Sequence, residues 1–297
     1  MEAIKSTNLV KRYGGRLALD HLTASIPANT ITGIVGRNGA GKTTLLKIIA
    51  GFTHETSGEI EVLSEHPFNS LHVSANSIFI DDFLTFPNTL TLIDVLKEGE
   101  RFYPNWQMDL AKKLLAYFEL GEQMVHNHLS KGKKSTFNAI FGLATRSSLT
   151  IFDEPTTGMD ASVRTDFYRA LLKDYLAHPR TVLISSHHVD EIEELLEYVL
   201  LIDQGKTKLH MEIDELREFL IGVSGRTELI EQWVKDRDVF FRRRIGDTET
   251  YLVIQNDVDA NELDKLGCRI ESISSSDACV YVTNKHKGGI DDVFANH

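Results

Sequence analysis

The hydrophobic and polar positions in the first part of the chain change their period abruptly. Leu22, Ala24 and Ile26 alternate with polar residues, which predicts a half-buried antiparallel strand. Residues 31–35 form a short apolar run, and after a glycine-rich turn the leucines and isoleucines of residues 43–50 have helical spacing. The pattern therefore predicts a strand, a loop and a buried helix in succession.

Two more short apolar runs, at residues 149–152 and 182–185, have the length of buried strands. A stretch predicted to be helical follows each run, and the second stretch carries the acidic residues Glu191, Glu193, Glu194 and Glu197. Strands that alternate with helices favour a parallel sheet at the core. Residues 83–147 have helical rather than strand periodicity, so we expect a helical insertion between the strands.

The pattern changes again after about residue 220. The elements expected there are strands at 219–223, 239–243 and 250–254 and around Ile270 and Val280, with helices at 227–234 and 260–266. This order resembles a small ferredoxin-like α+β module. We therefore expect two domains, 1–220 and 221–297. The second contains no catalytic motif, which leaves assembly, regulation or a passive lid as its role.

Charge and composition exclude several classes of protein. The chain has 297 residues, with 32 Lys and Arg against 43 Asp and Glu, a formal net charge of −11. Nucleic acid and anionic lipid repel such a chain, so we expect no nucleic acid partner. No apolar run approaches the roughly 18 residues that cross a bilayer, and the first residues lack the apolar stretch of a secretory signal. These features predict a cytoplasmic protein, in which Cys268 and Cys279, both in strand-like sequence, stay reduced.

A glycine-rich motif follows the apolar run 31–35. Residues 36–44, GRNGAGKTT, satisfy the pattern G-x-x-x-x-G-K-[ST] between a predicted strand and a predicted helix. The backbone N–H groups of such a loop surround phosphates, Lys42 places a positive charge at the β and γ oxygens, and Thr43 can ligate Mg²⁺. The residues expected to bind the phosphates are Gly36, Arg37, Asn38, Gly39, Ala40, Gly41, Lys42, Thr43 and Thr44.

Two adjacent carboxylates, Asp153 and Glu154, follow the apolar run 149–152. Ligands of open parallel sheets bind at the carboxyl ends of the strands, where these side chains would lie. Asp153 is suited to hold Mg²⁺, and Glu154 to polarise the water that attacks the γ-phosphate. Together with the glycine-rich loop, the pair predicts an ATPase site that uses ATP and Mg²⁺.

With these two motifs, roughly residues 1–210 resemble the ATP-binding subunits of ABC transporters. The resemblance implies an α/β fold of the P-loop NTPase type, with a parallel sheet core, an antiparallel β subdomain and an α-helical insertion, followed here by a small C-terminal α+β domain. In this family an aromatic residue stacks on adenine, and Tyr13 occupies the corresponding position. The π face of a tyrosine ring suits such stacking.

Residues 129–133, LSKGK, resemble the family's LSGGQ signature, which binds the γ-phosphate of ATP held by the other subunit of a dimer. Ser130 and Gly132 are retained, while Lys131 and Lys133 replace a glycine and the glutamine. Asp160 is the acidic residue of a segment that bridges the two subunits in the family. The resemblance implies a dimer around two Mg-ATP, formed with a second copy or with a paralogous subunit.

His187 follows the apolar run 182–185 and occupies the family position that contacts the γ-phosphate. Where the family has a glutamine that senses Mg²⁺ and the attacking water, this chain has Asp81 and Asp82; spacing favours Asp82 and leaves Asp81 open. A carboxylate still suits a hard cation. The resemblance thus implies Lys42, Glu154 and His187 as catalytic residues and Thr43, Asp153 and Asp82 as metal ligands.

The aromatic segment 102–106, FYPNW, and the SKG form of the signature are similar to a bacterial subgroup of YtrB-like ATPases that work with separately encoded efflux permeases. The resemblance implies an exporter subunit that associates with the membrane only through its permease. The aromatic residues belong either to the core or to a partner surface. A non-transport ABC ATPase and a nucleotide-sensing subunit with low turnover are the alternatives. His126 and His128 are spaced for opposite faces of a strand, so we expect no metal site there.

Overall fold

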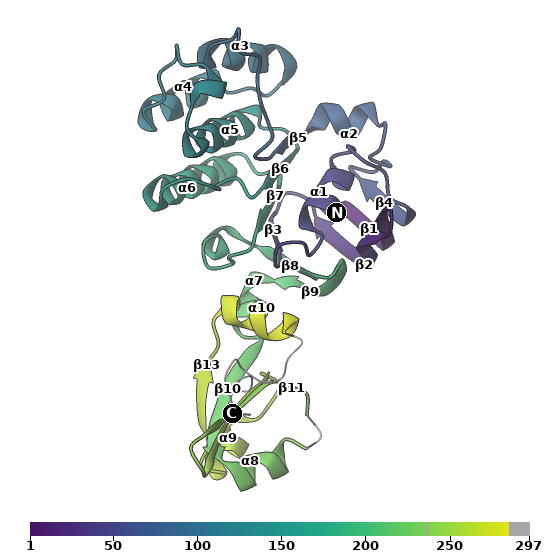
Figure 1. Ribbon diagram of the computed structural model, residues 1–297, viewed down its shortest axis with the longest axis vertical. Coiled ribbons are helices and arrows are strands. Elements are labelled where there is room, and N and C mark those ends of the chain that lie inside the picture. The colour runs from purple at the N-terminus through teal and green to yellow at the C-terminus, as the bar shows by residue number, and fades with distance from the viewer. Residues whose placement is uncertain (236, 285–297) are drawn as a thin grey trace. The chain divides into compact units, whose positions relative to one another are not determined.

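The computed structural model describes residues 1–235 and 237–284, in two compact units, Met1–His210 and Met211–His297 (Figure 1). Each unit has its own hydrophobic core. Among the described residues, no helix combines the length and the apolar character that crossing a membrane requires.

The first unit is centred on a six-stranded sheet with the order β5-β6-β7-β3-β8-β9. The strands are β3 (Ile31–Val35), β5 (Ser77–Ile80), β6 (Leu149–Asp153), β7 (Thr181–Ser186), β8 (Tyr198–Asp203) and β9 (Lys206–Glu212). β5, β6, β7, β3 and β8 pair in parallel, and every residue of β3 is buried. The predicted parallel core is confirmed, and the carboxyl ends of these strands share one edge.

An antiparallel sheet of order β2-β1-β4 packs on the same core. It contains β1 (Glu2–Tyr13), β2 (Arg16–Pro27) and β4 (Ser57–Val62). Its inward-facing side chains share one apolar cluster with β3 and with α1 (Lys42–Ile49), in which Leu22, Ile34 and Leu46 are completely buried. This packing fixes the turn between β3 and α1, where the glycine-rich motif lies (Figure 1).

The helical insertion is confirmed and lies away from the antiparallel sheet in Figure 1. Its helices are α3 (Leu92–Phe102), α4 (Met108–Tyr117), the 3₁₀ turn η1 (His126–His128) and α5 (Lys131–Thr145), whereas α2 (Leu71–Asn76) precedes β5 and α6 (Ala161–Ala177) follows β6. The ring of Trp106 fills the space that a side chain at Gly99 would need, whereas Phe102 is exposed. The aromatic segment is therefore divided between core and surface.

The helix predicted after β7 is wrong. Between β7 and β8 the chain forms only the 3₁₀ turn η2 (Glu193–Leu195). The Glu197 carboxylate accepts a hydrogen bond from the Ile31 N–H, and the Glu197 N–H donates to the Ile31 carbonyl. These bonds return the chain to β3 within a short connection, so the acidic residues lie on turns instead of on a helix.

The second unit contains a four-stranded antiparallel sheet with the order β11-β12-β10-β13. Its elements are α7 (Ile213–Arg217), β10 (Leu220–Arg226), α8 (Thr227–Trp233), β11 (Val239–Ile245), β12 (Glu249–Gln255), α9 (Ala260–Lys265), β13 (Arg269–Ser272) and α10 (Ser275–Thr283). Val223, Ile230, Leu252 and Leu263 are completely buried in its core. From β10 to β13 the order is β-α-β-β-α-β, as in ferredoxin-like modules.

The last strand expected in this unit, around Val280, is wrong. Val280 lies in α10, which begins at the N-cap Ser274, whose hydroxyl accepts a hydrogen bond from the Asp277 N–H. A serine followed three residues later by an acidic residue is a helix-start signal, and here it overrides the alternating pattern. The cysteines do not lie in strands either, because Cys279 belongs to α10 and Cys268 to the turn before β13.

Candidate functional site

The glycine-rich turn after β3 can be made only with glycine at two of its positions. Gly36 and Gly41 have φ values of +155° and +116°. A Cβ atom at Gly36 would lie 2.2 Å from the Ile202 carbonyl oxygen, and one at Gly41 would lie 2.7 Å from the Ala18 carbonyl oxygen. The turn is therefore pressed against β8 and β2, with its backbone in conformations that L side chains rarely adopt.

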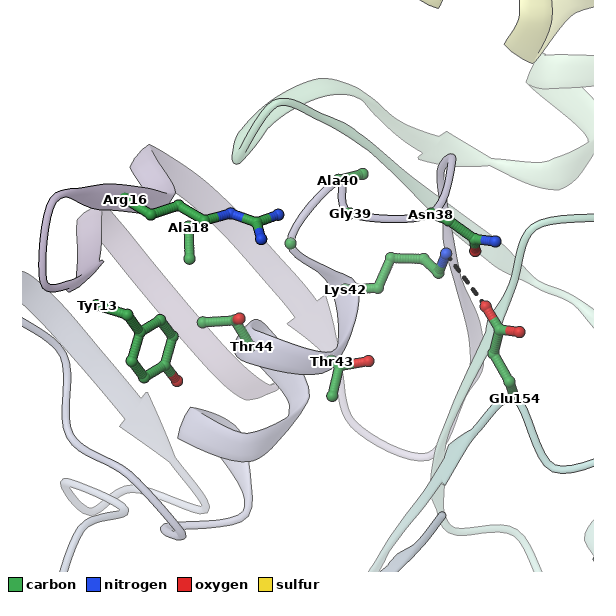
Figure 2. Close-up of a pocket in the computed structure, with 11 residues that line it drawn as sticks. Tyr13, Arg16, Ala18, Asn38, Gly39, Ala40, Lys42, Thr43, Thr44 and Glu154 are labelled. Carbon is green, nitrogen blue, oxygen red and sulfur yellow. Dashed lines mark ion pairs between the residues drawn. The ribbon is translucent and has the colours of Figure 1, made fainter. Parts of the chain in front are cut away.

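The turn borders a cavity of about 380 Å³ at the carboxyl edge of the sheet. Figure 2 shows Lys42, Thr43, Thr44 and Asn38 around this cavity, with Tyr13 and Arg16 from β1 and β2 beyond them. Tyr13 is 48% exposed, and Lys11 Nζ lies over one face of its ring, 5.0 Å from the centroid, so a base can stack only on the other face. Gly39, Ala40 and Gly41 also line the cavity, but Gly36 and Arg37 do not.

Lys42 lies at the centre of the site, where only 5% of its surface is exposed. Its Nζ donates a 2.7 Å hydrogen bond to the Gly36 carbonyl oxygen and lies 3.3 Å from Glu154 Oε1 (Figure 2). A buried ammonium group needs an opposite charge nearby, and Glu154 supplies it here.

Glu154 joins two of the predicted catalytic residues. Its other carboxylate oxygen, Oε2, lies 3.2 Å from Nδ1 of His187, which follows β7. The backbone of Glu154 has a φ of +49°, and its N–H donates to Ser185 Oγ at 2.9 Å. A left-handed conformation is uncommon for glutamate, and here it turns the side chain out of the line of β6 toward Lys42.

Asp153 ends β6 and is 7% exposed. Burial raises the pKa of its carboxyl, the hydrogen bonds from Ser185 and Thr43 oppose that rise, and the nearby charges of Glu154 and Asp81 add to it. Thr43 thus lies within hydrogen-bonding reach of Asp153. A hydroxyl and a carboxylate that meet beside a phosphate-binding turn are the oxygen donors that Mg²⁺ prefers, so these residues fit the ion.

The two aspartates after β5 face different neighbours. The charge of Asp81 reaches Asp153, and its Oδ1 accepts a hydrogen bond from the Phe83 N–H. Asp82 forms an ion pair with Lys131 across 3.1 Å, and neither aspartate lines the cavity. The structure therefore brings Asp81, rather than Asp82, to the predicted metal ligands.

The signature segment is held at the start of α5, outside this cavity. Ser130 is the N-cap of α5, and its Oγ accepts a long hydrogen bond of 3.4 Å from the Lys133 N–H. A Cβ at Gly132 would lie 2.3 Å from the Gly158 carbonyl oxygen, so only glycine allows this contact with the segment before α6. Asp160, the N-cap of α6, is exposed and uses no side-chain oxygen to cap its helix. None of these three predicted residues lines the chain's own phosphate cavity.

His126 lies in η1 instead of on a strand and is 1% exposed. Its Nε2 lies 2.8 Å from Asn138 Oδ1, while the Asn138 amide donates to the carbonyls of Asp81 and Leu84. Burial lowers the pKa of His126. This buried contact ties α5 to the loop that follows β5.

The sequence of the first unit is similar to that of known proteins. A family model described as ABC transporter matches residues 19–157. The chain is 29% identical over 227 residues to the ABC transporter ATP-binding protein YtrB of Bacillus subtilis, with 74% of this chain and 75% of that protein covered. It is 30% identical over 218 residues to the bacitracin transport ATP-binding protein BcrA of Bacillus licheniformis, with coverage of 72% and 71%.

The chain belongs to the family of ATP-binding subunits of ABC transporters. This subunit is therefore an ATPase, as its motifs predicted. Its fold is also that of solved ABC cassettes: the dimeric structure of the cassette MJ0796 superposes with a TM-score of 0.61 at 21% identity, over 71% of this chain and 98% of that chain.

Two residues of this ABC subunit were missed by the sequence reading. Arg16 lines the cavity because the hairpin register pairs it with Tyr13 at the end of β1. That register was the available signal, since the two residues flank the turn Gly14-Gly15. Asn138 gives no local signal, because its partners His126, Asp81 and Leu84 are distant in sequence.

Proposed function

We propose that this subunit hydrolyses Mg-ATP in a head-to-tail dimer and drives a separately encoded membrane permease, in the direction of export. The observation that carries the proposal is the contact of Lys42 with Glu154 and of Glu154 with His187 beside the phosphate turn. A positive charge, a carboxylate and an imidazole at one edge of a parallel sheet are the groups that phosphoryl transfer to water requires.

The chemistry assigned to each group follows from its position. Lys42 moves from Glu154 to the β and γ oxygens when ATP enters, which frees the carboxylate to polarise the attacking water. His187 orients that carboxylate and contacts the γ-phosphate. Thr43 and Asp153, with Asp81 nearby, would hold Mg²⁺, and the ion would supply positive charge to the phosphate oxygens.

The dimer is proposed because three of the predicted nucleotide-binding residues, Ser130, Gly132 and Asp160, lie in segments that do not line the cavity. Ser130, Gly132 and Asp160 surround the start of α5, where backbone N–H groups and the positive end of the helix favour an anion. A second copy or a paralogous subunit, turned head to tail, supplies the γ-phosphate to this surface. Each nucleotide is then enclosed by the phosphate turn of one subunit and the signature of the other.

We assign the binding site for the permease to an apolar groove on the helical insertion. This groove of about 630 Å³ is lined by Leu84, Phe86 and Leu90 from the loop after β5 and by Phe102 and Tyr103 at the end of α3. Phe102 is 77% exposed, an unusual position for a large aromatic side chain without a partner. A short apolar helix of a permease fits this groove. The subunit would then lie at the cytoplasmic face of the membrane, attached through the permease alone.

The test is the rate of Mg-ATP hydrolysis by the purified chain, alone and with its permease in lipid vesicles. We expect turnover that rises when the permease is present and transported substrate that leaves the side holding the ATPase. Turnover that the permease leaves unchanged would favour a non-transport ATPase. Tight ATP binding with almost no hydrolysis in either state would favour a nucleotide sensor, which the negative charge of Asp81 beside Asp153 would explain.

We further propose that residues 1–220 form the ATP-binding domain and 221–297 an accessory domain for assembly. The compact units divide at His210, because α7 already packs with α10 of the second unit. β11 and β13 are edge strands of the four-stranded sheet, and such edges pair readily with another copy.

A chain shortened after Glu212, where β9 ends, tests this role. It should bind ATP as before yet form a weaker dimer without nucleotide in sedimentation. Equal dimerisation of the short and full chains would leave only a lid or a ligand-sensing role.

A further inference from the structure

The first residue of α5, Lys131, has a partner that the signature motif does not predict. Its Nζ lies 3.1 Å from Asp82 Oδ2, and the two side chains are 64% and 33% exposed. The stem of Lys131 lies against the segment before α6, since a Cβ at Gly158 would be 3.3 Å from Lys131 Cγ. The ion pair thus connects the signature, the loop after β5 and the approach to α6.

Asp81, Asp153 and Glu154 lie close together, after β5 and at the end of β6. Asp81 and Glu154 both act on Asp153, and Lys42 is already paired with Glu154. A γ-phosphate that arrives at the start of α5 from a second copy would also meet the charge of Asp82. Lys131, the first residue of α5, places a compensating ammonium beside Asp82, and its flexible stem permits it to change partners.

We infer that Lys131 exchanges partners during the ATPase cycle: it pairs with Asp82 in the nucleotide-free subunit and with the γ-phosphate of ATP held by the second copy in the closed dimer. The inference rests on the proposed head-to-tail dimer. In this arrangement Asp82 is a positioning residue that holds the lysine back and raises the ATP concentration needed for closure. Asp82 is then a partner of the signature and not a metal ligand.

The two members of the pair have opposite expected effects, which a purely structural ion pair does not. In a Glu154→Gln background, where closed dimers accumulate, the Mg-ATP concentration at half-maximal dimerisation is measured by sedimentation. Lys131→Gln should raise it about tenfold, because a charge-assisted contact with phosphate is lost. Asp82→Asn should lower it several-fold, because the lysine no longer leaves a carboxylate when it binds phosphate. Binding of ATP to the monomer should be unchanged in both variants.

Lys97 provides a matched control. Its Nζ lies 3.2 Å from Asp94 Oδ1 on α3, with side-chain exposures of 60% and 40%, nearly the same geometry as the Lys131 pair. Lys97→Gln should leave the half-maximal concentration where it is.

If this concentration shifts in the same direction for Lys131→Gln and Asp82→Asn, or no further than for Lys97→Gln, the inference about Lys131 is wrong. The proposed dimer would not be affected by that result. If the Glu154→Gln parent forms no dimer at any Mg-ATP concentration, the proposed dimer is wrong and the inference falls with it.

Discussion

The phosphate turn and the signature segment are both glycine-containing helix starts, but only the first is complete within one chain. At the phosphate turn, Lys42 contacts Glu154, and Glu154 contacts His187. At the signature, Ser130 caps its own helix through a long hydrogen bond, and Lys131 forms an ion pair with Asp82. In the proposed dimer each chain would therefore contribute a catalytic half, at the phosphate turn, and a separate binding half, at the signature.

Glu154→Gln, in the catalytic half, is expected to have the largest effect on ATP hydrolysis. The amide keeps the size of the carboxylate but cannot polarise water, so we expect hydrolysis to fall by at least about 100-fold while ATP still binds. The variant should accumulate as a closed dimer in Mg-ATP, visible in sedimentation. Glu194→Gln, on the exposed turn η2, is the matched control and should hydrolyse ATP normally. Near-normal turnover by Glu154→Gln would contradict its assigned role.

Mixing two defective chains tests whether the halves act together. Lys42→Ala disables the phosphate turn and Ser130→Arg blocks the signature, so each chain alone should be inactive. An equal mixture should regain about a quarter of the wild-type rate, because half of the dimers then contain one intact site of two. Lys42→Ala mixed with Glu154→Gln is the control and should regain nothing, since both changes affect the catalytic half. No recovery in the first mixture at saturating protein would count against the sandwich.

The catalytic half could be predicted from sequence because its residues are local to strand ends. Glycines 36 and 41, Lys42 and the pair Asp153 and Glu154 each follow a short buried strand, and parallel pairing brings those ends to one edge. The same reasoning favoured Asp82 and left Asp81 open, whereas in the structure Asp81 is the one whose charge reaches Asp153. Successive residues at a strand end point in opposite directions, so the choice depends on β5 ending at Ile80.

Hydrophobic periodicity predicted the wrong element in two segments, for two different reasons. The segment after β7 lacks its expected helix because Glu197 is bonded to Ile31 of β3. The segment around Val280 alternates like a strand, but the cap at Ser274 begins a helix. The contact between Glu197 and Ile31 is invisible in a window of neighbouring residues. The cap at Ser274 is a local signal, which periodicity alone does not take into account.

The smallest expected effect is a change in how the free energy of unfolding depends on pH. His126 supports the binding half, because Asn138, its partner, is held on α5 and donates to Asp81 and Leu84. Those donations leave Asn138 Oδ1 as an acceptor, so Nε2 of His126 carries the proton. Burial lowers the pKa of His126 below its ordinary value near 6.5, a shift that the charge of Lys134 favours and the hydrogen bonds with Asn138 and Asn127 oppose. The unfolded chain therefore takes up this proton first as pH falls.

The stability that neutral His126 provides should accordingly be complete above about pH 6.5 and decline as pH falls below it. His126→Phe keeps a ring between Phe86 and Phe137 but leaves Asn138 Oδ1 without its donor. At pH 8 we expect the free energy of unfolding to fall by about 1–3 kcal/mol, the cost of an unpaired buried acceptor. Between pH 6.5 and 5 the variant should lose less stability than the parent. Part of the loss that persists in the variant comes from His210, whose pKa burial also lowers. Urea unfolding at each pH measures both effects, and the exposed His72→Gln should behave like the parent. Equal pH dependence in His126→Phe and the parent would show that this histidine does not titrate on unfolding as its burial requires.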